Sequence, residues 1–526
     1  MGALSEIERH ARILPDTVSQ TRNIISQARA SMHVVTSDAS PSPYSRARQN
    51  LVVAVLAFAG MGAAFMQTIL IPIQSELPEL LGAAPADTAW VITVTLLTAA
   101  VATPIAGKLG DMYGKRKIAI ILMGILVLGS LICALSPGLT GLIVGRALQG
   151  TGMGVIPLGI SLLRDVVDAR RLGTSIALVS ATLGVGGAIG LPISAVVTQN
   201  FDWQMLFVLS TAVAAIAMIL IIAVVPAAGT RTGGRVDLGG AIGLAIGLVG
   251  VLLAISQGNT WGWTSAATLS SAGIGIVAFA LWGWYELRQE NPLVDLRVSV
   301  KPSVLTTNLA AVAMGFALFS SNIAFPQLLE LPDAVGGLGL GLLPASLVLM
   351  PSGLAMLAMS PIAGRIERSV GPRPLLVAGA SVIAVAYLVC VFADLQVWHI
   401  AVVNTIIGIG IGLGYAAMPA LIMNAVPRSE TGAANGLNTL MRAFGTTVAS
   451  AVVGAILAGA TGSNMTSSFS IIFVMGLIAA IACAVLAFLI PHGKHRDAAA
   501  DHDVAPSEAD SAAHTEGSKV LPLNRH

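Results

Sequence analysis

The sequence predicts an all-α integral membrane protein whose chain crosses a lipid bilayer fourteen times. Three observations support this fold class. Of the 526 residues, 55% are hydrophobic and only 10% are charged, against about 25% charged in a typical globular chain. The apolar residues gather in runs of membrane-spanning length. The lysines and arginines fall in alternate connections between these runs, which is typical of multi-pass membrane proteins. This composition excludes a soluble fold.

Fourteen apolar runs are long enough to cross about 30 Å of hydrocarbon, which takes roughly 20 helical residues. Because the number is even, both termini are expected on the same side of the membrane. The predicted spans are 51–73, 88–107, 118–136, 139–162, 173–198, 203–226, 236–256, 266–287, 303–329, 342–363, 374–393, 398–425, 432–460 and 468–490.

The distribution of basic residues supports this number of spans. Of the 28 lysines and arginines, Arg146 and Arg442 lie within spans, and the remaining 26 fall in the tails or in alternate loops. The opposite loops carry acids instead: Glu76, Glu79, Asp87, Asp202, Glu330 and Asp333. By the positive-inside rule, we expect both termini to be cytoplasmic in a multi-pass plasma-membrane protein.

The two ends of the chain differ from the spans in composition. Residues 1–50 contain no apolar run of signal-peptide length, so the first span is expected to act as an uncleaved insertion signal. Translation that starts at Met1 and translation that starts at Met32 are both open. Residues 491–526 are rich in Ala, Asp, His and Ser, and are predicted to form a disordered cytoplasmic tail.

The composition also argues against several functions. A formal net charge of +2 offers no broad basic surface, so nucleic acid is not an expected partner. The cysteines Cys133, Cys390 and Cys483 lie singly in apolar runs, which does not indicate a disulfide framework or a metal site. The sequence contains no phosphate-binding loop, so ATP is not the expected energy source. No cofactor is expected.

An internal repeat relates the two halves of the chain. The loop 107–116 has a degenerate echo at 364–373, an offset of 257, and glycines in two further pairs of spans keep nearly the same offset. The seventh and eighth spans have no counterpart. We therefore expect a six-helix bundle over 51–226, a two-helix insert within 227–300 and a second six-helix bundle over 301–490, with a site between the bundles near the bilayer midplane.

Two motifs carry a resemblance to a known family. Residues 107–117 are similar to the loop signature G-x-L-x-D-x-x-G-R-R of the major facilitator superfamily, and residues 146–152 resemble its R-x-x-Q-G-x-G signature. Residues 261–263, 286–288 and 291–297 are similar to the end of the extra helix pair in the fourteen-helix branch of drug:proton antiporters. The resemblance covers about 51–490.

The first motif predicts a conformational switch built from Gly107, Asp111, Gly114 and Arg116. The Asp111 carboxylate is expected to cap the start of a neighbouring helix and to pair with Arg116, which would hold one arrangement of the bundles until the pair breaks. An ordinary solvated charge in a turn is the alternative. Arg368 takes the place of the acid in the echo, so we expect the second half to lack an equivalent latch.

Arg146 and Arg442 are both placed well inside a span, where an unpaired guanidinium costs at least about 2.5 kcal/mol. We therefore expect both to face protein or water. The resemblance implies that Arg146, together with Gln149 of the same motif, takes part in proton coupling. For Arg442, a role in transport and a bond between helices are both open.

The fifth span is rich in glycine. Its residues Gly186, Gly190 and Pro192 resemble the antiporter signature, which has adjacent Gly and Pro, whereas Leu191 separates them here. The stretch permits close packing and a proline kink. Close packing alone is the alternative to a functional hinge.

The group that carries the proton is not evident. Members of the resembled branch have an acid in the first span, and residues 65–72 contain none. The candidates lie at span edges and are Glu286, Glu330 and Asp394, with His399 nearby, although each fits an interface residue as well. Uncharged polar residues at depth are candidates either for lining a cavity or for bridging helices: Gln67, Gln149, Asn322, Asn404, Tyr415 and Asn438.

Together these features predict a secondary transporter that acts as a monomer within the lipid bilayer. We expect it to export lipophilic or amphiphilic small molecules by alternating access, with the proton gradient as energy source. A facilitator or importer of a specific small metabolite is the first alternative. A membrane enzyme is the remote alternative. It would need His, Asp or Ser clustered at one depth, and no histidine lies well inside a span with an acidic partner.

Overall fold

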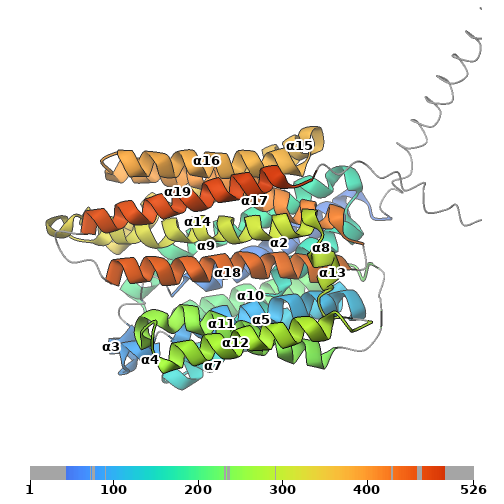
Figure 1. The fold of residues 1–526 in the computed structure, drawn as a ribbon, viewed down its shortest axis with the longest axis horizontal. Coiled ribbons are helices and arrows are strands. Elements are labelled where there is room, and N and C mark those ends of the chain that lie inside the picture. The colour runs from blue at the N-terminus through green and yellow to red at the C-terminus, as the bar shows by residue number, and fades with distance from the viewer. Residues whose placement is uncertain are drawn as a thin grey trace, which may run out of the picture. The chain divides into compact units, whose positions relative to one another are not determined.

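The computed structural model describes residues 43–491 apart from 71, 72, 74–76, 89, 230–232, 234–236, 291, 428, 429 and 459–464. Over this part of the chain the secondary structure is helical, without strands. The long helices run side by side in one direction or its reverse (Figure 1).

Thirteen helices in the described residues are long and apolar enough to cross a membrane. They are α2 (Arg46–Thr68), α5 (Trp90–Tyr113), α6 (Lys115–Leu135), α9 (Ala169–Asn200), α10 (Met205–Val224), α11 (Leu238–Trp261), α12 (Ala266–Glu286), α14 (Pro302–Glu330), α15 (Leu342–Val370), α16 (Pro372–Phe392), α17 (Val397–Ala425), α18 (Thr431–Ala458) and α19 (Met465–Leu489). The short helices α3 (Leu77–Leu81), α4 (Pro85–Thr88), α13 (Leu296–Ser299) and η1 (Asp333–Val335) lie in connections.

The fourth predicted span does not form one continuous helix. It is divided into α7 (Leu139–Gly152) and α8 (Val155–Val166), with Met153 and Gly154 between them. A Cβ on Gly152 would lie 2.7 Å from that of Leu126, so the break occurs where α7 packs tightly against α6. Counted as one interrupted segment, α7 and α8 complete the fourteen predicted crossings within the described residues.

The first helix begins five residues earlier than predicted. α2 starts at Arg46 because the Ser45 side chain accepts a hydrogen bond from the Arg48 backbone N–H at 3.4 Å. A serine in this position is a favourable N-cap, since it satisfies one of the free N–H groups of the first turn. The basic residues of this segment therefore belong to the helix and not to the preceding tail.

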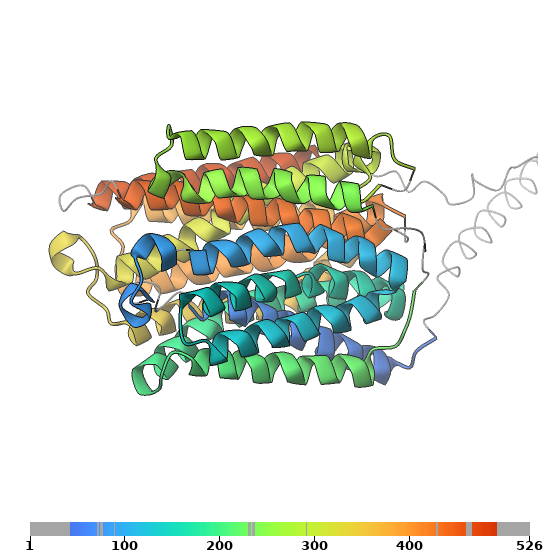
Figure 2. The same ribbon diagram turned by 90° about the horizontal axis from the view of Figure 1, so that it is seen from below.

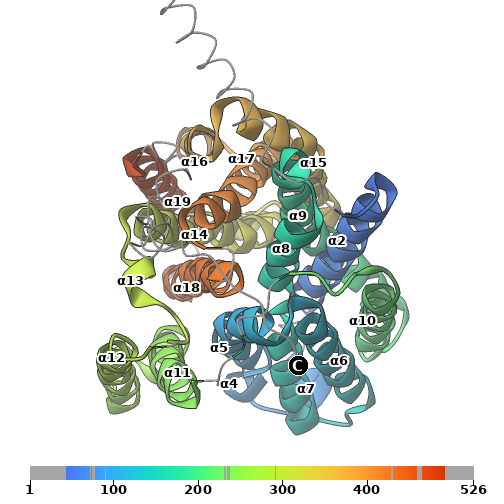
Figure 3. The same ribbon diagram turned by 90° about the vertical axis from the view of Figure 1, so that its right-hand side faces the viewer.

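The helices on either side of the insert form two bundles, and each has an apolar core built mainly from its own helices. The core of the first bundle, α2 and α5–α10, includes the fully buried Met66, Leu126 and Phe207. The core of the second bundle, α14–α19, is built around Phe325 and Phe473. Figure 3, which looks along the helices, shows the two bundles beside each other, with α9, α5 and α18 towards the middle.

The two inserted helices form a hairpin in which glycine meets aromatic rings. A Cβ at Gly243 would lie 3.0 Å from the Trp282 ring, and one at Gly247 would lie 2.9 Å from Phe279, so the absence of side chains lets α12 approach α11. α11 in turn packs on both bundles, because its leucines share a core with Leu97 of α5 and Leu440 of α18. Figure 2 shows the hairpin (green) beside α18 (orange) and α5 (blue).

Candidate functional site

The two bundles meet along two lines of helix contact. α5 packs against α18 at what we call the first seam, and α9 packs against α15 at the second seam. Both seams reach the end of the bundles that carries the basic loops, which we call the basic end. A Cβ on Gly107 would overlap the backbone of Gly432 at the first seam, and a Cβ on Gly364 would overlap Thr174 at the second. The internal repeat therefore places glycine at the closest approach of both seams.

Asp111 crosses the first seam. Its carboxylate accepts hydrogen bonds from the backbone N–H groups of Gly432 at 3.2 Å and Ala433 at 3.0 Å, and its side chain is 3% exposed. Since α18 begins at Thr431, these N–H groups belong to its first turn and have no partner within the helix. A negative charge is also favourable at this positive end of the helix dipole. The helix cap predicted from the sequence is confirmed, whereas its action as a switch stays a prediction.

Among the described residues Lys115 pairs with Asp111, and the predicted pair with Arg116 is wrong. Lys115 Nζ lies 3.8 Å from Asp111 Oδ1 and 2.7 Å from Asp165 Oδ2, in a buried position. Gly114, with φ of 106°, separates α5 from α6. Lys115 is the first residue of α6 and faces the seam, whereas the following residue is turned about 100° around the helix.

Arg116 contacts the neighbouring helix of its own bundle. It donates a hydrogen bond to the Ile222 carbonyl on α10 at 2.6 Å. A second contact across the first seam comes from Arg164, which donates to Thr431 Oγ1 at 2.9 Å. No pattern in the sequence pointed to Arg164 or Asp165, because they follow the interrupted span without a motif.

The second seam carries an acid in the corresponding place but lacks the cap. Glu367 lies against Gly173, where an added Cβ would be 2.7 Å from the carboxyl carbon. Its buried Oε2 has no hydrogen-bond partner among the described residues. α9 begins at Ala169, so Gly173 is past the first turn and its N–H is used within the helix. Among the described residues, Glu367 therefore caps no helix, and the expectation that the second half lacks an equivalent latch stays a prediction.

Arginines surround the end of the second seam. A pocket of about 410 Å³ lies there, with Arg171, Arg365 and Arg368 among its lining residues and Val53 and Pro361 deeper along the helices. Arg368 donates to the carbonyl of Gly364 at 3.2 Å within α15 and to the carbonyl of Arg170 on α9, across the second seam, at 3.4 Å. The acid that faces the seam is Glu367, one residue before the position that the repeat offset predicts.

Arg146 lies in the core of the first bundle. It is 1% exposed and donates to the Met66 carbonyl at 2.9 Å, to Gln149 Oε1 at 2.8 Å and to the Val91 carbonyl at 3.4 Å. Gln149 continues the network by donating to Ser130 Oγ at 2.8 Å. The guanidinium thus joins α2, α5 and α7, and these contacts all belong to its own bundle. Its predicted part in proton coupling stays a prediction.

Arg442 and Tyr415 are brought together between α18 and α17. The guanidinium carbon lies 4.4 Å from the centre of the Tyr415 ring, which is a cation–π contact. Such a contact contributes about 0.5–2 kcal/mol. The ion pairs among the described residues belong to Lys115, so Arg442 has this ring as its charge-stabilising neighbour.

The glycines of α9 pack this helix against α2. A Cβ at Gly186 would overlap the Met61 carbonyl, and one at Gly190 would overlap the Thr68 hydroxyl. Pro192 lies within the same continuous helix. The structure therefore uses Gly186 and Gly190 for close packing within the first bundle, which was the alternative to a hinge.

The polar residues considered for a cavity are spread over the molecule. Asn438 donates to Asn308 Oδ1 at 3.0 Å between α18 and α14, and Asn404 donates to the Leu349 carbonyl at 3.2 Å between α17 and α15. Gln67 and Asn322 are exposed. These side chains do not gather at one place in the structure, apart from the contact of Tyr415 with Arg442.

The residues at span edges have separate environments. Glu286 is buried and accepts hydrogen bonds from the backbone N–H groups of Leu293 and Val294, at 3.3 and 3.1 Å. It thereby fixes the connection between the insert and the second bundle. Glu330 and Asp394 are exposed, and His399 accepts a bond from the backbone N–H of Gln396 at the start of α17.

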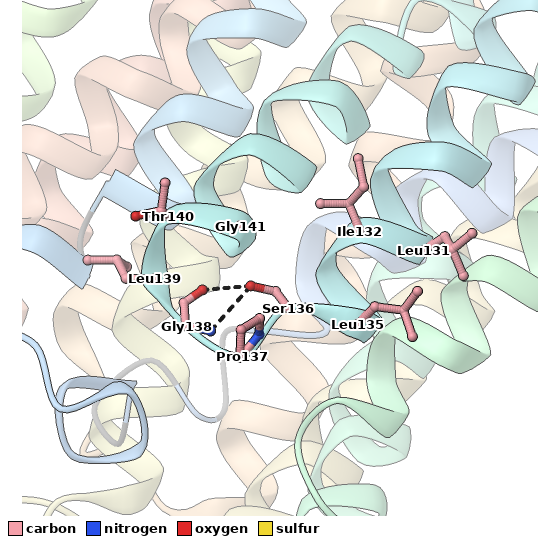
Figure 4. Close-up of a pocket in the computed structure, with 9 residues that line it drawn as sticks. All are labelled: Leu131, Ile132, Leu135, Ser136, Pro137, Gly138, Leu139, Thr140 and Gly141. Carbon is pink, nitrogen blue, oxygen red and sulfur yellow. Dashed lines mark hydrogen bonds between the residues drawn. The ribbon is translucent and has the colours of Figure 1, made fainter.

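A surface hollow lies away from both seams. It has a volume of about 580 Å³ and is lined by residues 131, 132 and 135–141, at the turn from α6 to α7 (Figure 4). Ser136 Oγ donates to the Gly138 carbonyl and accepts from its N–H, at 2.7 and 3.3 Å, which fixes the turn. The lining residues carry no charge, so this hollow has no group that could couple transport to protons.

Comparison with known proteins identifies the class to which this architecture belongs. The family model described as Major Facilitator Superfamily matches residues 56–237, 229–450 and 307–521. The chain belongs to the Major Facilitator Superfamily and is a multi-pass membrane transporter.

Named relatives and a solved structure support this assignment. The chain is 28% identical over 414 residues to the lincomycin resistance protein LmrB of Listeria monocytogenes, covering 77% of this chain and 86% of that protein. It is 25% identical over 377 residues to the multidrug resistance protein Stp of Mycobacterium tuberculosis, covering 70% and 68%. The fold resembles the proton:xylose symporter XylE with a TM-score of 0.60 at 13% identity, over 85% of this chain and 97% of XylE.

Proposed function

We propose that this transporter exports lipophilic or amphiphilic small molecules from the cytoplasm by alternating access, driven by the proton gradient. The observation that carries the proposal is the cap at the first seam, where one buried carboxylate holds the first turn of a helix in the other bundle. Beside this cap, Gly107 lies directly against the backbone of Gly432, and Arg164 donates a hydrogen bond to Thr431 across the same seam.

Alternating access needs an interface that closes on one side while it opens on the other. The contacts described at the basic end close that side, through Asp111 and Gly432 at the first seam and through Glu367 and Gly173 at the second. Most of the apolar core of each bundle comes from its own helices, which favours movement of each bundle as a rigid body.

The positive-inside rule supports the orientation of this interface. Lys115, Arg171 and Arg365 belong to the basic loops, which the rule places in the cytoplasm of a plasma-membrane protein. In the described arrangement, the carrier would then be closed towards the cytoplasm. A protein of this kind can act as a monomer, because both bundles belong to one chain.

Coupling to protons is supported by the chemistry of the cap. The attraction of Asp111 for the positive end of α18 and for Lys115 depends on its negative charge. Binding of a proton would remove that charge and weaken the first seam. Arg146 and Gln149 would act within the first bundle, where they connect the ends of α2 and α5.

The substrate class is supported by the printed names of the relatives, which are resistance proteins for lincomycin and for multiple drugs. Identities of 25–28% support export of drug-like molecules as a class and not any one compound. The relatives therefore favour amphiphilic cargo over a single metabolite.

Purified protein in lipid vesicles tests the proposal. An imposed pH gradient is expected to drive accumulation of rhodamine 123, an amphiphilic dye, and a protonophore is expected to abolish it. Asp111→Asn should lose this activity, and Arg116→Gln, which changes a contact outside the seam, should retain it. Uptake that is equal with and without the gradient would contradict proton coupling.

A facilitator or importer of a small metabolite remains the second candidate, because the first span carries no acid between Phe65 and Leu70. In the same vesicles, a facilitator would equilibrate its substrate without a pH gradient. Gradient-independent equilibration of a metabolite, together with no movement of the dye, would favour this candidate.

A further inference from the structure

Arg442 is a cation placed at depth, and no acidic side chain among the described residues pairs with it. It lies eleven residues after Thr431, the first residue of α18, which is about 16 Å along the helix from its start. Tyr415 is ten residues before Ala425, the last residue of α17, which is about 15 Å from that end. Both ends lie at the basic end, so the guanidinium and the ring share a depth near the middle of the bilayer.

The backbone beneath Arg442 is held rigidly by the neighbouring helix. A Cβ on Gly315 of α14 would overlap the Arg442 carbonyl, so the two helices touch at this residue. One turn away, Asn438 donates a hydrogen bond to Asn308 Oδ1 at 3.0 Å. These contacts fix the position of the Cα atom, while the side chain extends to the half-buried space between α18 and α17.

The same face of α18 carries further polar groups. Asn435, Thr439, Arg442 and Thr446 follow one another at three- or four-residue intervals, which places them on one side of the helix. The opposite faces are occupied, because Gly436 contacts Pro104 of α5, and Leu437, Leu440 and Phe444 pack with the insert.

The Asn435 side chain also indicates that a polar ligand binds on this face of α18. Its side chain is 3% exposed, and both the amide nitrogen and the amide oxygen lack a hydrogen-bond partner among the described residues. Buried amides are normally satisfied, so such a group needs a partner from outside the described contacts. Asn435 lies seven residues before Arg442, which is about 10 Å along the polar face. An extended molecule could contact both side chains.

We propose that the polar face of α18 binds the cargo and that Arg442 pairs with an anionic group on it, so that the preferred substrates are amphiphiles that carry a carboxylate. This inference rests on the proposed function and names its substrate class. A carboxylate matches the guanidinium because two parallel N–H groups can donate to its two oxygens. The Tyr415 ring leaves those N–H groups free, since it contacts the flat face of the guanidinium.

A matched pair of dyes tests this inference. Rhodamine 110 carries a carboxylate, and rhodamine 123 is its methyl ester with the same aromatic body. We expect the wild-type protein in detergent to bind the acid at least about tenfold more tightly than the ester, as measured by fluorescence anisotropy, because hydrogen bonds between charged groups are the stronger ones. Arg442→Gln should reduce this difference to less than about twofold, and Arg442→Lys should retain part of it.

The control is another arginine that lies over an aromatic ring. Arg288 lies 3.9 Å from the Trp284 ring on the exposed side of the insert, and Arg288→Gln should leave the preference for the acid unchanged. Equal affinity of the wild type for both dyes, a preference for the ester, or a preference that survives in Arg442→Gln would overturn the inference. Binding by the wild type decides the question even where a variant does not fold.

The outcome can be separated from that of the proposed function. If a pH gradient moves neither dye while the binding preference depends on Arg442, the proposed export is contradicted and the preference for an anionic group stands. If the gradient moves both dyes and Arg442→Gln leaves their ratio unchanged, export stands and the inference is contradicted.

Discussion

The two seams are related by the internal repeat, yet different chemistry closes them. At the first seam Asp111 caps α18, which begins one residue before Gly432. At the second seam Glu367 faces the equivalent Gly173, but α9 begins four residues earlier, and the carboxylate finds no free N–H group there. A repeat can therefore preserve a glycine contact without preserving the cap, because the starting residue of the opposing helix decides whether donors are available.

The two seams also differ in the groups that lie next to them. At the end opposite the basic end, α11 contacts α18, where Asn259 donates to the Ala451 carbonyl at 2.8 Å. At the basic end of the second seam lies a pocket lined in part by Arg171, Arg365 and Arg368. Because the carboxylate cap of α18 is found at the first seam, we expect opening at the basic end to be controlled there.

Removal of the Asp111 charge should have the largest effect. Asp111→Asn keeps the shape of the side chain but replaces charged hydrogen bonds, each worth about 1.5–3 kcal/mol, by neutral ones. We expect the initial rate of gradient-driven dye uptake in vesicles to fall at least about tenfold. An unchanged rate, at equal protein content per vesicle, would show that the cap does not control transport.

The glycines at the seams should differ in their tolerance of a methyl group. In Gly432→Ala the new Cβ would lie 2.6 Å from the Gly107 carbonyl oxygen, so backbone must move, at a cost of about 1–3 kcal/mol. In Gly173→Ala the Cβ meets the flexible end of Glu367, which can turn away. Thermal unfolding in detergent should show a lower Tm for Gly432→Ala than for Gly173→Ala. The reverse order would contradict the claim that the first seam is the more tightly packed at its glycine.

The contact between Arg164 and Thr431 should have an intermediate effect. Thr431→Val removes the hydroxyl that accepts from Arg164 at 2.9 Å and keeps the shape of the side chain. A hydrogen bond to a charged group contributes about 1.5–3 kcal/mol, but the half-buried Arg164 can regain water, so we expect a two- to fivefold fall in uptake rate. A loss as large as that of Asp111→Asn would mean that this bond, and not the carboxylate cap, holds the seam.

Glu367→Gln should have the smallest effect. The Glu367 Oε2 atom accepts no hydrogen bond from the described residues, so removal of the charge loses no cap. Uptake rate and pH dependence are expected to stay within about twofold of the wild type. If this variant were as impaired as Asp111→Asn, the two seams would be equivalent, and the start of the helix would not be the deciding feature.

The membrane crossings can be predicted from the sequence more fully than the side-chain contacts between helices. Apolar run length and charge sorting predict the fourteen crossings, because both follow from the thickness and polarity of the bilayer. The division of the fourth crossing at Met153 is not evident, since a continuous apolar run contains no signal for a break between two glycines. The cap by Asp111 is predictable from the motif, but its partner Lys115 depends on where α6 begins.

The contacts across the seams depend on tertiary packing. The repeat offset of 257 points to Arg368, which donates to the Arg170 carbonyl across the second seam, but the acid that lies against Gly173 is the preceding residue, Glu367. Arg146 is recognisable as a charge at depth, but its carbonyl partners on α2 and α5 carry no sequence signal. Backbone acceptors are present at every residue, so geometry alone selects them.

Spin labels on the two bundles at the basic end test the central claim most directly. Labels at Tyr113 of α5 and Asn424 of α17, both exposed, would report the distance between the bundles at the basic end. The cysteines Cys133, Cys390 and Cys483 are buried and should not interfere. In pulsed electron paramagnetic resonance, we predict one main short distance for the wild type and for Glu367→Gln, and an additional longer distance for Asp111→Asn. The same distance distribution in all three proteins would contradict the claim that the Asp111 cap holds the basic end closed.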